Sequence, residues 1–168
     1  MSETAQQYTQ RILGYVEGKP ALDVLAATAE TLERLIEGVP AAKLRKRRPA
    51  PNRWSVSEIL AHLADGEIVG AFRMRLILGA PGASVAAYDQ DAWVTSGHYE
   101  TRDPRQSLEQ FRVVRDGNLA LLKSLEPEQW KHYGVHSERG QESIEQIARM
   151  FAGHDLNHLW QVERILTS

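Results

Sequence analysis

Along four long stretches of the chain, apolar residues are spaced three and four positions apart. This spacing places them on one face of an α-helix, and that face is stable in water only when other helices cover it. The stretches cover residues 22–36, 55–79, 104–126 and 143–166. Segments in which apolar and polar residues alternate are almost absent, so the sequence predicts an all-α fold, a four-helix bundle.

Residues at the predicted helix starts support these boundaries. Ser55 with Glu58, and Ser143 with Gln146, have the spacing of a capping box, in which the paired side chains bond to free backbone N–H groups. Asp103 stands directly before a proline, an order typical of a helix cap and first turn.

Two further segments complete the predicted fold. Residues 4–16 have the character of a short N-terminal helix. Residues 81–102 lack helical spacing and form a connection longer than most in compact bundles. A loop of that length can cover a site, so we expect it to help determine specificity.

Length and composition indicate one ordinary globular domain over residues 1–168, with 25% charged and 42% apolar residues. The net charge of −2 provides no general attraction for nucleic acid. Neither a signal peptide nor an apolar run of about 20 residues occurs. We therefore expect a cytoplasmic protein that binds neither membrane nor nucleic acid.

The most basic segment precedes two prolines and contains no interleaved aromatic residue. Its basic residues are Lys43, Arg45, Lys46, Arg47 and Arg48, and the prolines are Pro49 and Pro51. We interpret this segment as a solvated loop rather than a phosphate-binding patch.

The fourth predicted helix carries two histidines on its apolar face. The seam positions of this helix are Ile147, Phe151, His154, His158, Gln161 and Ile165. Side chains four residues apart lie on one helix face, close enough for two imidazoles to bind one metal ion at about 2.0–2.1 Å. The chain has no cysteine, so a metal must be held by nitrogen or oxygen. With His62 in the second helix, this pair predicts a three-histidine metal site.

Other interpretations of the histidines stay open at this point. A single histidine on an apolar face is more often a core or surface residue than a ligand, and a pair spaced by four also arises by chance. His98, His132 and His136 lie in or near predicted loops, where solvent exposure is the ordinary state. The sequence lacks both HExxH and paired Glu-x-x-His motifs, which argues against a zincin protease and a di-iron bundle.

A mononuclear site with three neutral imidazoles leaves coordination positions open for water or substrate, an arrangement typical of catalysis. Such an ion lowers the pKa of bound water or activates a thiolate or carbonyl.

Polar neighbours of the histidines are candidates for hydrogen bonding to them. They are the carboxylates Glu58, Asp65, Glu67 and Asp155, whereas Gln161, one turn beyond His158, is a candidate to line the cavity. The alternatives are a solvated helix face or an ion pair for the carboxylates, and a register-setting seam residue for Gln161. Trp54 and Trp160 are predicted to pack in the core.

The segments RPAPNRWSVSEILAHLADGE and SIEQIARMFAGHDLNHLWQVERIL resemble the DinB-like (YfiT-type) superfamily of metal-dependent bundles, over residues 20–166. The resemblance implies an up-down-down-up bundle, often dimeric, that holds one divalent ion such as zinc, nickel, manganese or iron. By motif, its ligands fall on His62, His154 and His158. Characterised members are thiol-dependent S-transferases or isomerases, and others have been named as hydrolases.

From the motif and the resemblance we hypothesise a metal-dependent enzyme that joins a low-molecular-weight thiol, as co-substrate, to an electrophilic small molecule. Hydrolysis by the metal site is the alternative among enzymes. A third hypothesis, from a different class, is a stress or interaction module in which the ion only links two helices. The resemblance also leads us to expect a homodimer.

Overall fold

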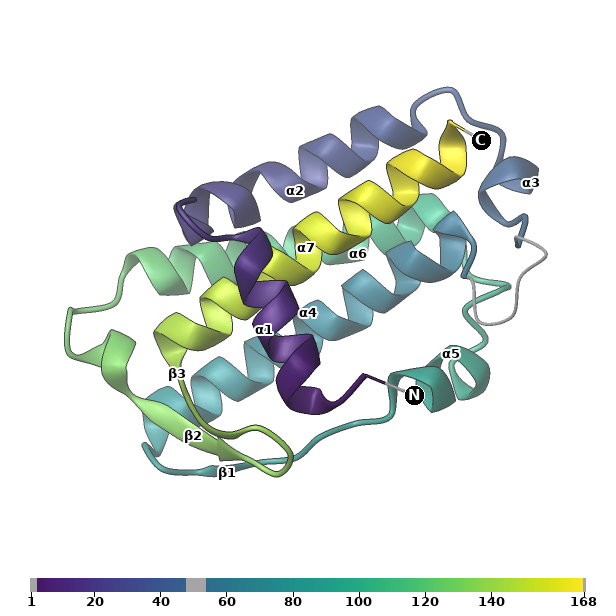
Figure 1. Cartoon of the computed structure of the whole chain (residues 1–168). Coiled ribbons are helices and arrows are strands. Elements are labelled where there is room, and N and C mark those ends of the chain that lie inside the picture. Colours follow the sequence, from purple (N-terminus) through teal and green to yellow (C-terminus); the bar gives the residue numbers. More distant parts are fainter. Residues whose placement is uncertain (1–2, 48–53, 168) are drawn as a thin grey trace.

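A computed structural model of the chain describes residues 3–47 and 54–167. Its four long helices are α2 (Ala21–Ile36), α4 (Val56–Gly79), α6 (Pro104–Lys123) and α7 (Ile144–Leu166), which lie lengthwise in a bundle (Figure 1). Helix α2 packs against α7 and α6, and helix α4 packs against α6 and α7. Helices α2 and α7 run in one direction and α4 and α6 in the other (Figure 1). The predicted four-helix bundle and its up-down-down-up order are confirmed.

The long connection between α4 and α6 follows from this order. Consecutive helices that run in the same direction must be joined by a segment that returns along the bundle. Helix α4 has 24 residues and is therefore about 36 Å long. The connection contains strand β1 (Ser84–Val85) and helix α5 (Gln90–Ser96), so the expectation that it has no helix was wrong. The side chain of Asp89 caps α5 by accepting hydrogen bonds from two backbone N–H groups.

A three-stranded sheet lies at one end of the bundle, in the order β1-β2-β3 (Figure 1). Strands β2 (Tyr133–His136) and β3 (Gly140–Ser143) form an antiparallel hairpin, and β1 pairs with β2 in parallel. The all-α prediction missed this sheet because no strand exceeds four residues, too few to display alternation. The sheet is a minor part of a mostly helical fold.

The predicted helix starts are correct. Ser55 and Ser143 each form a complete capping box with the residue three positions later, and Asp103 caps α6. Helix α6 ends at Lys123, earlier than predicted. A 3₁₀ turn, η1 (Gln129–Lys131), follows it.

The basic segment is only partly the loop that was predicted. It begins in a short helix, α3 (Ala41–Leu44), whose Leu44 is buried while the neighbouring basic side chains are exposed. Arg48, Pro49 and Pro51 lie outside the described residues.

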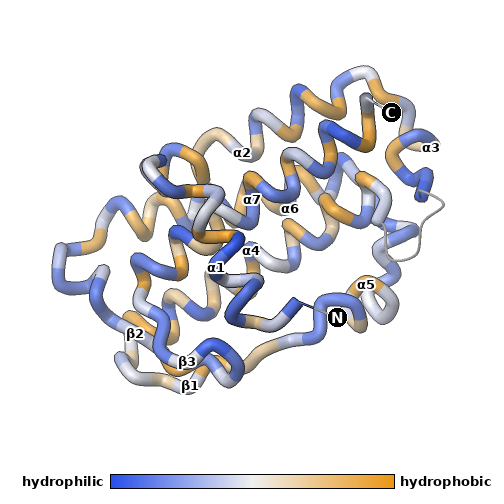
Figure 2. The backbone as a smooth tube through the Cα atoms, viewed as in Figure 1, coloured by the Kyte–Doolittle hydropathy of each residue, from blue (hydrophilic) through white to orange (hydrophobic). Residues whose placement is uncertain are grey.

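The core has two large apolar parts, separated along the bundle axis by a layer of buried polar residues, and a smaller third group of Ala61, Val94 and Tyr99. Figure 2 shows hydrophobic and hydrophilic positions alternating around the long helices, as a helical period requires. The part near the sheet includes Met74, Ile77, Leu122, Ile144 and Ile147, and the other part includes Leu32, Leu60, Leu108, Phe111 and Val162. The polar layer contains Thr28, His62, Glu67, Arg115, Asn118, Asp155 and His158. Within the described ranges, no helix combines the length and apolar character needed to cross a membrane.

The predicted N-terminal helix is α1 (Ala5–Tyr15), which crosses α7 (Figure 1). Gly153 of α7 lies at this crossing. A Cβ atom built on Gly153 would stand 2.1 Å from the carbonyl oxygen of Ile12, a backbone atom of α1. The absence of a side chain at Gly153 therefore allows α1 to lie directly on α7.

We expect Gly153→Ala to lower the free energy of unfolding by about 1–3 kcal/mol, because the added methyl group must displace α1. Alanine is otherwise the better helix former by about 1 kcal/mol. Gly117→Ala is the matched control, because Gly117 lies mid-helix with no atom within 4 Å of its built Cβ. It should stabilise the chain. Urea unfolding followed by circular dichroism measures both variants, and equal effects would contradict the tight crossing.

Candidate metal centre

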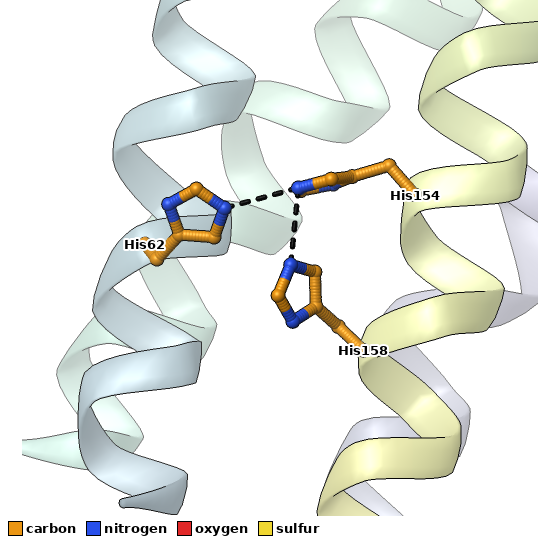
Figure 3. A group of neighbouring side chains, drawn as sticks. All are labelled: His62, His154 and His158. Atoms are coloured by element: carbon orange, nitrogen blue, oxygen red, sulfur yellow. Dashed lines mark hydrogen bonds between the residues drawn. The ribbon is translucent and has the colours of Figure 1, made fainter. Parts of the chain in front are cut away.

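Three histidines from two helices converge within the bundle (Figure 3). His62 comes from α4, and His154 and His158 lie one turn apart on α7. The Nε2 atom of His154 is 3.0 Å from Nε2 of His62 and 3.1 Å from Nε2 of His158. All three candidate ligand atoms lie within 4.8 Å of one another. The structure therefore brings together the three histidines that the sequence singled out.

Burial keeps these imidazoles neutral. His62 and His158 are 3% and 6% exposed, and His154 is partly exposed. Burial disfavours the charged imidazolium and lowers the pKa of His158 to about 4. The pKa values of His62 and His154 are well below the ordinary value, first through burial and then through the neighbouring histidines. Neutral imidazoles are the form that binds metal.

The hydrogen-bonding capacity of the cluster fits a bound cation. Nδ1 of His158 donates to Oε1 of Gln161 at 2.8 Å, so Nε2 of neutral His158 carries a lone pair. Nε2 of His154 contacts both other Nε2 atoms, yet a neutral nitrogen offers either one proton or one lone pair. If Nε2 of His154 donates its proton to one neighbour, it has no second proton for the other. If Nε2 of His154 instead accepts a hydrogen bond from His62, its lone pair faces the lone pair of His158. A cation among three lone pairs removes this conflict.

Gln161 and Trp54 hold the cluster in place. The hydrogen bond from His158 to Gln161 fixes the imidazole tautomer that directs Nε2 toward the other histidines. The Trp54 ring lies 4.8 Å from the ring of His62 and is stacked parallel to that of His158 at 6.3 Å. Trp54 packs on the core as predicted, whereas Trp160 is 45% exposed and forms a T-shaped pair with the ring of Tyr15, contrary to the prediction.

The carboxylates considered as partners for the histidines bond elsewhere. Glu58 is completely buried and bonds to Ser55 and Arg47, so the solvated-face interpretation was wrong for it. Asp65 accepts hydrogen bonds from Tyr99 and Arg102. The sequence suggested that a carboxylate hydrogen-bonds to one of the histidines. Among the described residues, the side-chain amide of Gln161 makes this hydrogen bond instead.

A buried ionic cluster beside the histidines was missed by sequence reasoning. Arg115 of α6 is 2% exposed and donates to Glu67 at 2.7 Å and to Asp155 at 2.6 Å. Asp155 also accepts from Thr28, and Asn118 donates to Glu67. Arg115 lies four residues after Phe111, on the buried face of α6. An arginine on the apolar face of a predicted helix was the sequence signal that could have revealed this ionic cluster.

Two cavities open onto the histidine cluster. The first, about 490 Å³, is lined by His154 together with residues of α1, α4, α7 and the β2–β3 turn. The second, about 460 Å³, is lined by His158, Gln161 and Trp54. Glu3 and Tyr8, from the N-terminal segment, line both cavities. The long α4–α6 connection also contributes to both, as expected from the sequence.

The remaining histidines lie outside the cluster. His98 is exposed and has a positive φ of 50°. His132 is partly buried between η1 and β2. His136 is 2% exposed in β2, so its expected solvent exposure was wrong. Its burial depends on the sheet, which the sequence did not predict.

Comparisons with known proteins show which family and which relatives this chain is similar to. The family model of the DinB superfamily matches residues 25–162. The chain is 27% identical over 115 residues to a candidate metal-dependent hydrolase of Halalkalibacterium halodurans, covering 68% of this chain and 67% of that protein. For YfiT of Bacillus subtilis, also named as a candidate metal-dependent hydrolase, identity is 25% over 113 residues, with coverage of 67% and 64%. The match therefore spans about two thirds of these relatives.

A solved structure of YfiT from Bacillus subtilis, described as a four-helix bundle of unusual topology, superposes with a TM-score of 0.80. It is 21% identical, and the superposition covers 98% of this chain and 88% of that one. This likeness shows that the fold is shared.

Proposed function

The chain belongs to the DinB superfamily, and on that basis we propose that it is a metal-dependent enzyme that transfers a low-molecular-weight thiol to an electrophilic small molecule. His62, His154 and His158 would hold one divalent ion through their Nε2 atoms. When bound, such an ion supplies positive charge that favours the deprotonated form of a thiol or of water.

The observation that carries this proposal is the pair of cavities on one histidine cluster. A transfer reaction needs room for two molecules, and His154 lines one cavity while His158 lines the other. In the reaction, the thiol gives its proton to solvent, its sulfur forms a bond to the electrophilic carbon, and the leaving group departs with the bonding electrons. A nucleophile supplied by the co-substrate also suits a chain that has no cysteine.

The residues of the chain have distinct parts in this proposal. Three neutral imidazoles bind without adding negative charge, so the ion keeps its full positive charge. Gln161 holds His158 in the tautomer with a free Nε2 lone pair. Trp54 covers His62 and His158 on one side and limits the access of water. A purely structural ion would need a closed set of protein ligands, and a cluster of three histidines beside two cavities favours catalysis instead.

Hydrolysis is the second candidate, and the names of the curated relatives favour it. Hydrolysis requires one organic substrate and water, so one cavity would suffice. The two reactions therefore differ in how they depend on the two cavities.

We expect purified protein loaded with a divalent ion to accelerate the reaction of monobromobimane with at least one thiol from a panel of cysteine, glutathione and coenzyme A. Met150→Trp fills the first cavity and Asn157→Trp the second. Each should raise KM for a different substrate by roughly tenfold while kcat changes less, because each removes ground-state binding. Steady-state fluorescence kinetics with both substrates varied provides the measurement.

Glu163→Trp, at an exposed position on α7, is the control for the bulk of the indole. A different result would identify a hydrolase: the protein hydrolyses p-nitrophenyl acetate without a thiol, and only one of the two cavity variants changes the kinetics of this hydrolysis. Absence of metal-dependent turnover in both assays would leave the interaction module as the better explanation.

A further inference from the structure

The imidazole of His136 lines the first cavity and has an unused hydrogen-bond donor. Its Nδ1 atom accepts a hydrogen bond from the backbone N–H of Glu138 at 3.1 Å. Burial, followed by the nearby Arg139, lowers the pKa of His136, so the ring is neutral near neutral pH and carries its proton on Nε2. This buried Nε2 atom has no partner among the described residues. An unpaired buried donor is costly, and a ligand in the cavity could satisfy it.

Two arginines line the same cavity as His136. Arg73 of α4 is 8% exposed and donates one hydrogen bond, to the carbonyl oxygen of Ala86. No acidic side chain of the described ranges pairs with Arg73. Arg139 forms a two-point ion pair with Glu142, so its charge is already balanced. Of these two arginines, Arg73 is therefore the one without an acidic side chain paired to it in the described ranges.

The acidic residues of this cavity do not supply that counter-ion. Glu3 pairs with Arg11, and Asp89 caps helix α5. Glu138 is exposed at the β2–β3 turn. Burial first, and then the proximity of Arg139, lower the pKa of Arg73, while Tyr88 and Glu142, which pairs with Arg139, oppose that lowering only in part.

We propose that Arg73, Arg139 and the Nε2–H of His136 form a subsite for an anionic group, a carboxylate or a phosphate, on the substrate. His154 of the histidine cluster lines the same cavity, so one molecule can place its anionic group on the arginines and its reacting atom at the cluster. The reading of the cavity as a substrate site rests on the proposed function, whereas anion binding itself does not. A guanidinium and a neutral N–H donor are suited to both oxyanions.

The small sheet explains why these groups are together. His136 pairs with Val85 of β1, and the backbone of the next residue in that segment, Ala86, holds the Arg73 guanidinium. Tyr88 lies under Arg73, with its ring centre 5.7 Å from the guanidinium carbon. The sheet at the end of the bundle (Figure 1) thus joins the α4–α6 connection to the β2–β3 hairpin around one cavity.

The test is a titration of metal-loaded, isotope-labelled full-length protein with inorganic phosphate and, separately, with succinate, observed in long-range proton–nitrogen spectra of the imidazoles. We expect His136 to show the Nε2–H tautomer and its Nε2 signal to shift with saturation. Arg73→Met should weaken binding at least tenfold, and Arg149→Met, which removes an exposed arginine elsewhere on α7, should not. Preference for phosphate or succinate identifies which oxyanion the substrate carries.

A His136 signal that neither anion moves would overturn the subsite, and this reading of the unmodified protein does not depend on whether a variant folds. Equal weakening by both arginine variants would overturn it too, because it would reveal only general charge attraction. The titration is repeated after chelation. Binding that disappears with the metal but survives Arg73→Met would assign the anion to the ion alone. The titration measures binding and not turnover. If the protein binds the anion saturably but has no transferase or hydrolase activity, the proposed function is refuted and the subsite stands.

Discussion

Alanine at His62, His154 or His158 is expected to reduce the metal content from about one divalent ion per chain to nearly none. Each histidine offers one ligand atom to a cluster in which all three atoms lie within 4.8 Å of one another. Two remaining imidazoles cannot enclose an ion as three do. The loss of affinity should exceed the ~10–100-fold that removal of an outer hydrogen-bond partner costs.

Elemental analysis after dialysis against a defined metal, with circular dichroism to verify folding, provides the measurement. His98→Ala is the control, because His98 is an exposed histidine outside the cluster. Gln161→Leu should give an intermediate result, since it keeps all three ligands but removes the hydrogen bond that fixes the tautomer of His158. If any one of the three alanine variants kept full metal content, that histidine would not be a ligand.

The sequence predicts the features of this site that depend only on the spacing of residues close together in the chain. Two histidines four residues apart on an apolar helix face share that face in any fold that keeps the helix. Capping boxes at Ser55 and Ser143 are equally local, and both are present. His62 needed one further step, the packing of α4 against α7, which the geometry of a four-helix bundle favours.

The features that the sequence did not predict depend on contacts between distant segments. Strands of two to four residues have no readable period, and β1 pairs with β2 across about 50 residues of chain. The burial of His136 and the cavity beside it follow from that pairing. The ion pairs of Glu58 and Glu67 could not be predicted, because the cations that pair with them, Arg47 and Arg115, lie elsewhere in the sequence.

Replacing Arg115 with methionine is expected to lower the free energy of unfolding by about 3–5 kcal/mol, the usual cost of breaking a buried ion pair from one side. Arg115 is the one cation among the described residues that bonds to both Glu67 and Asp155. Its removal leaves two carboxylates, each at most 3% exposed, without a counter-charge. Urea unfolding near neutral pH measures the effect, and Arg105→Met, at an exposed position of the same helix, is the control.

The pH dependence of this deficit separates lost charge balance from lost packing. Burial raises the pKa of Asp155, and the guanidinium of Arg115 opposes that rise. Without Arg115 the folded state holds a proton that the unfolded chain releases, so the deficit should shrink as pH falls from neutral toward the raised pKa. Adding Glu67→Gln and Asp155→Asn to Arg115→Met removes both buried charges and should restore most of the stability at neutral pH. A deficit that neither acid nor these amides reduce would mean that Arg115 stabilises the bundle by filling space rather than by its charge.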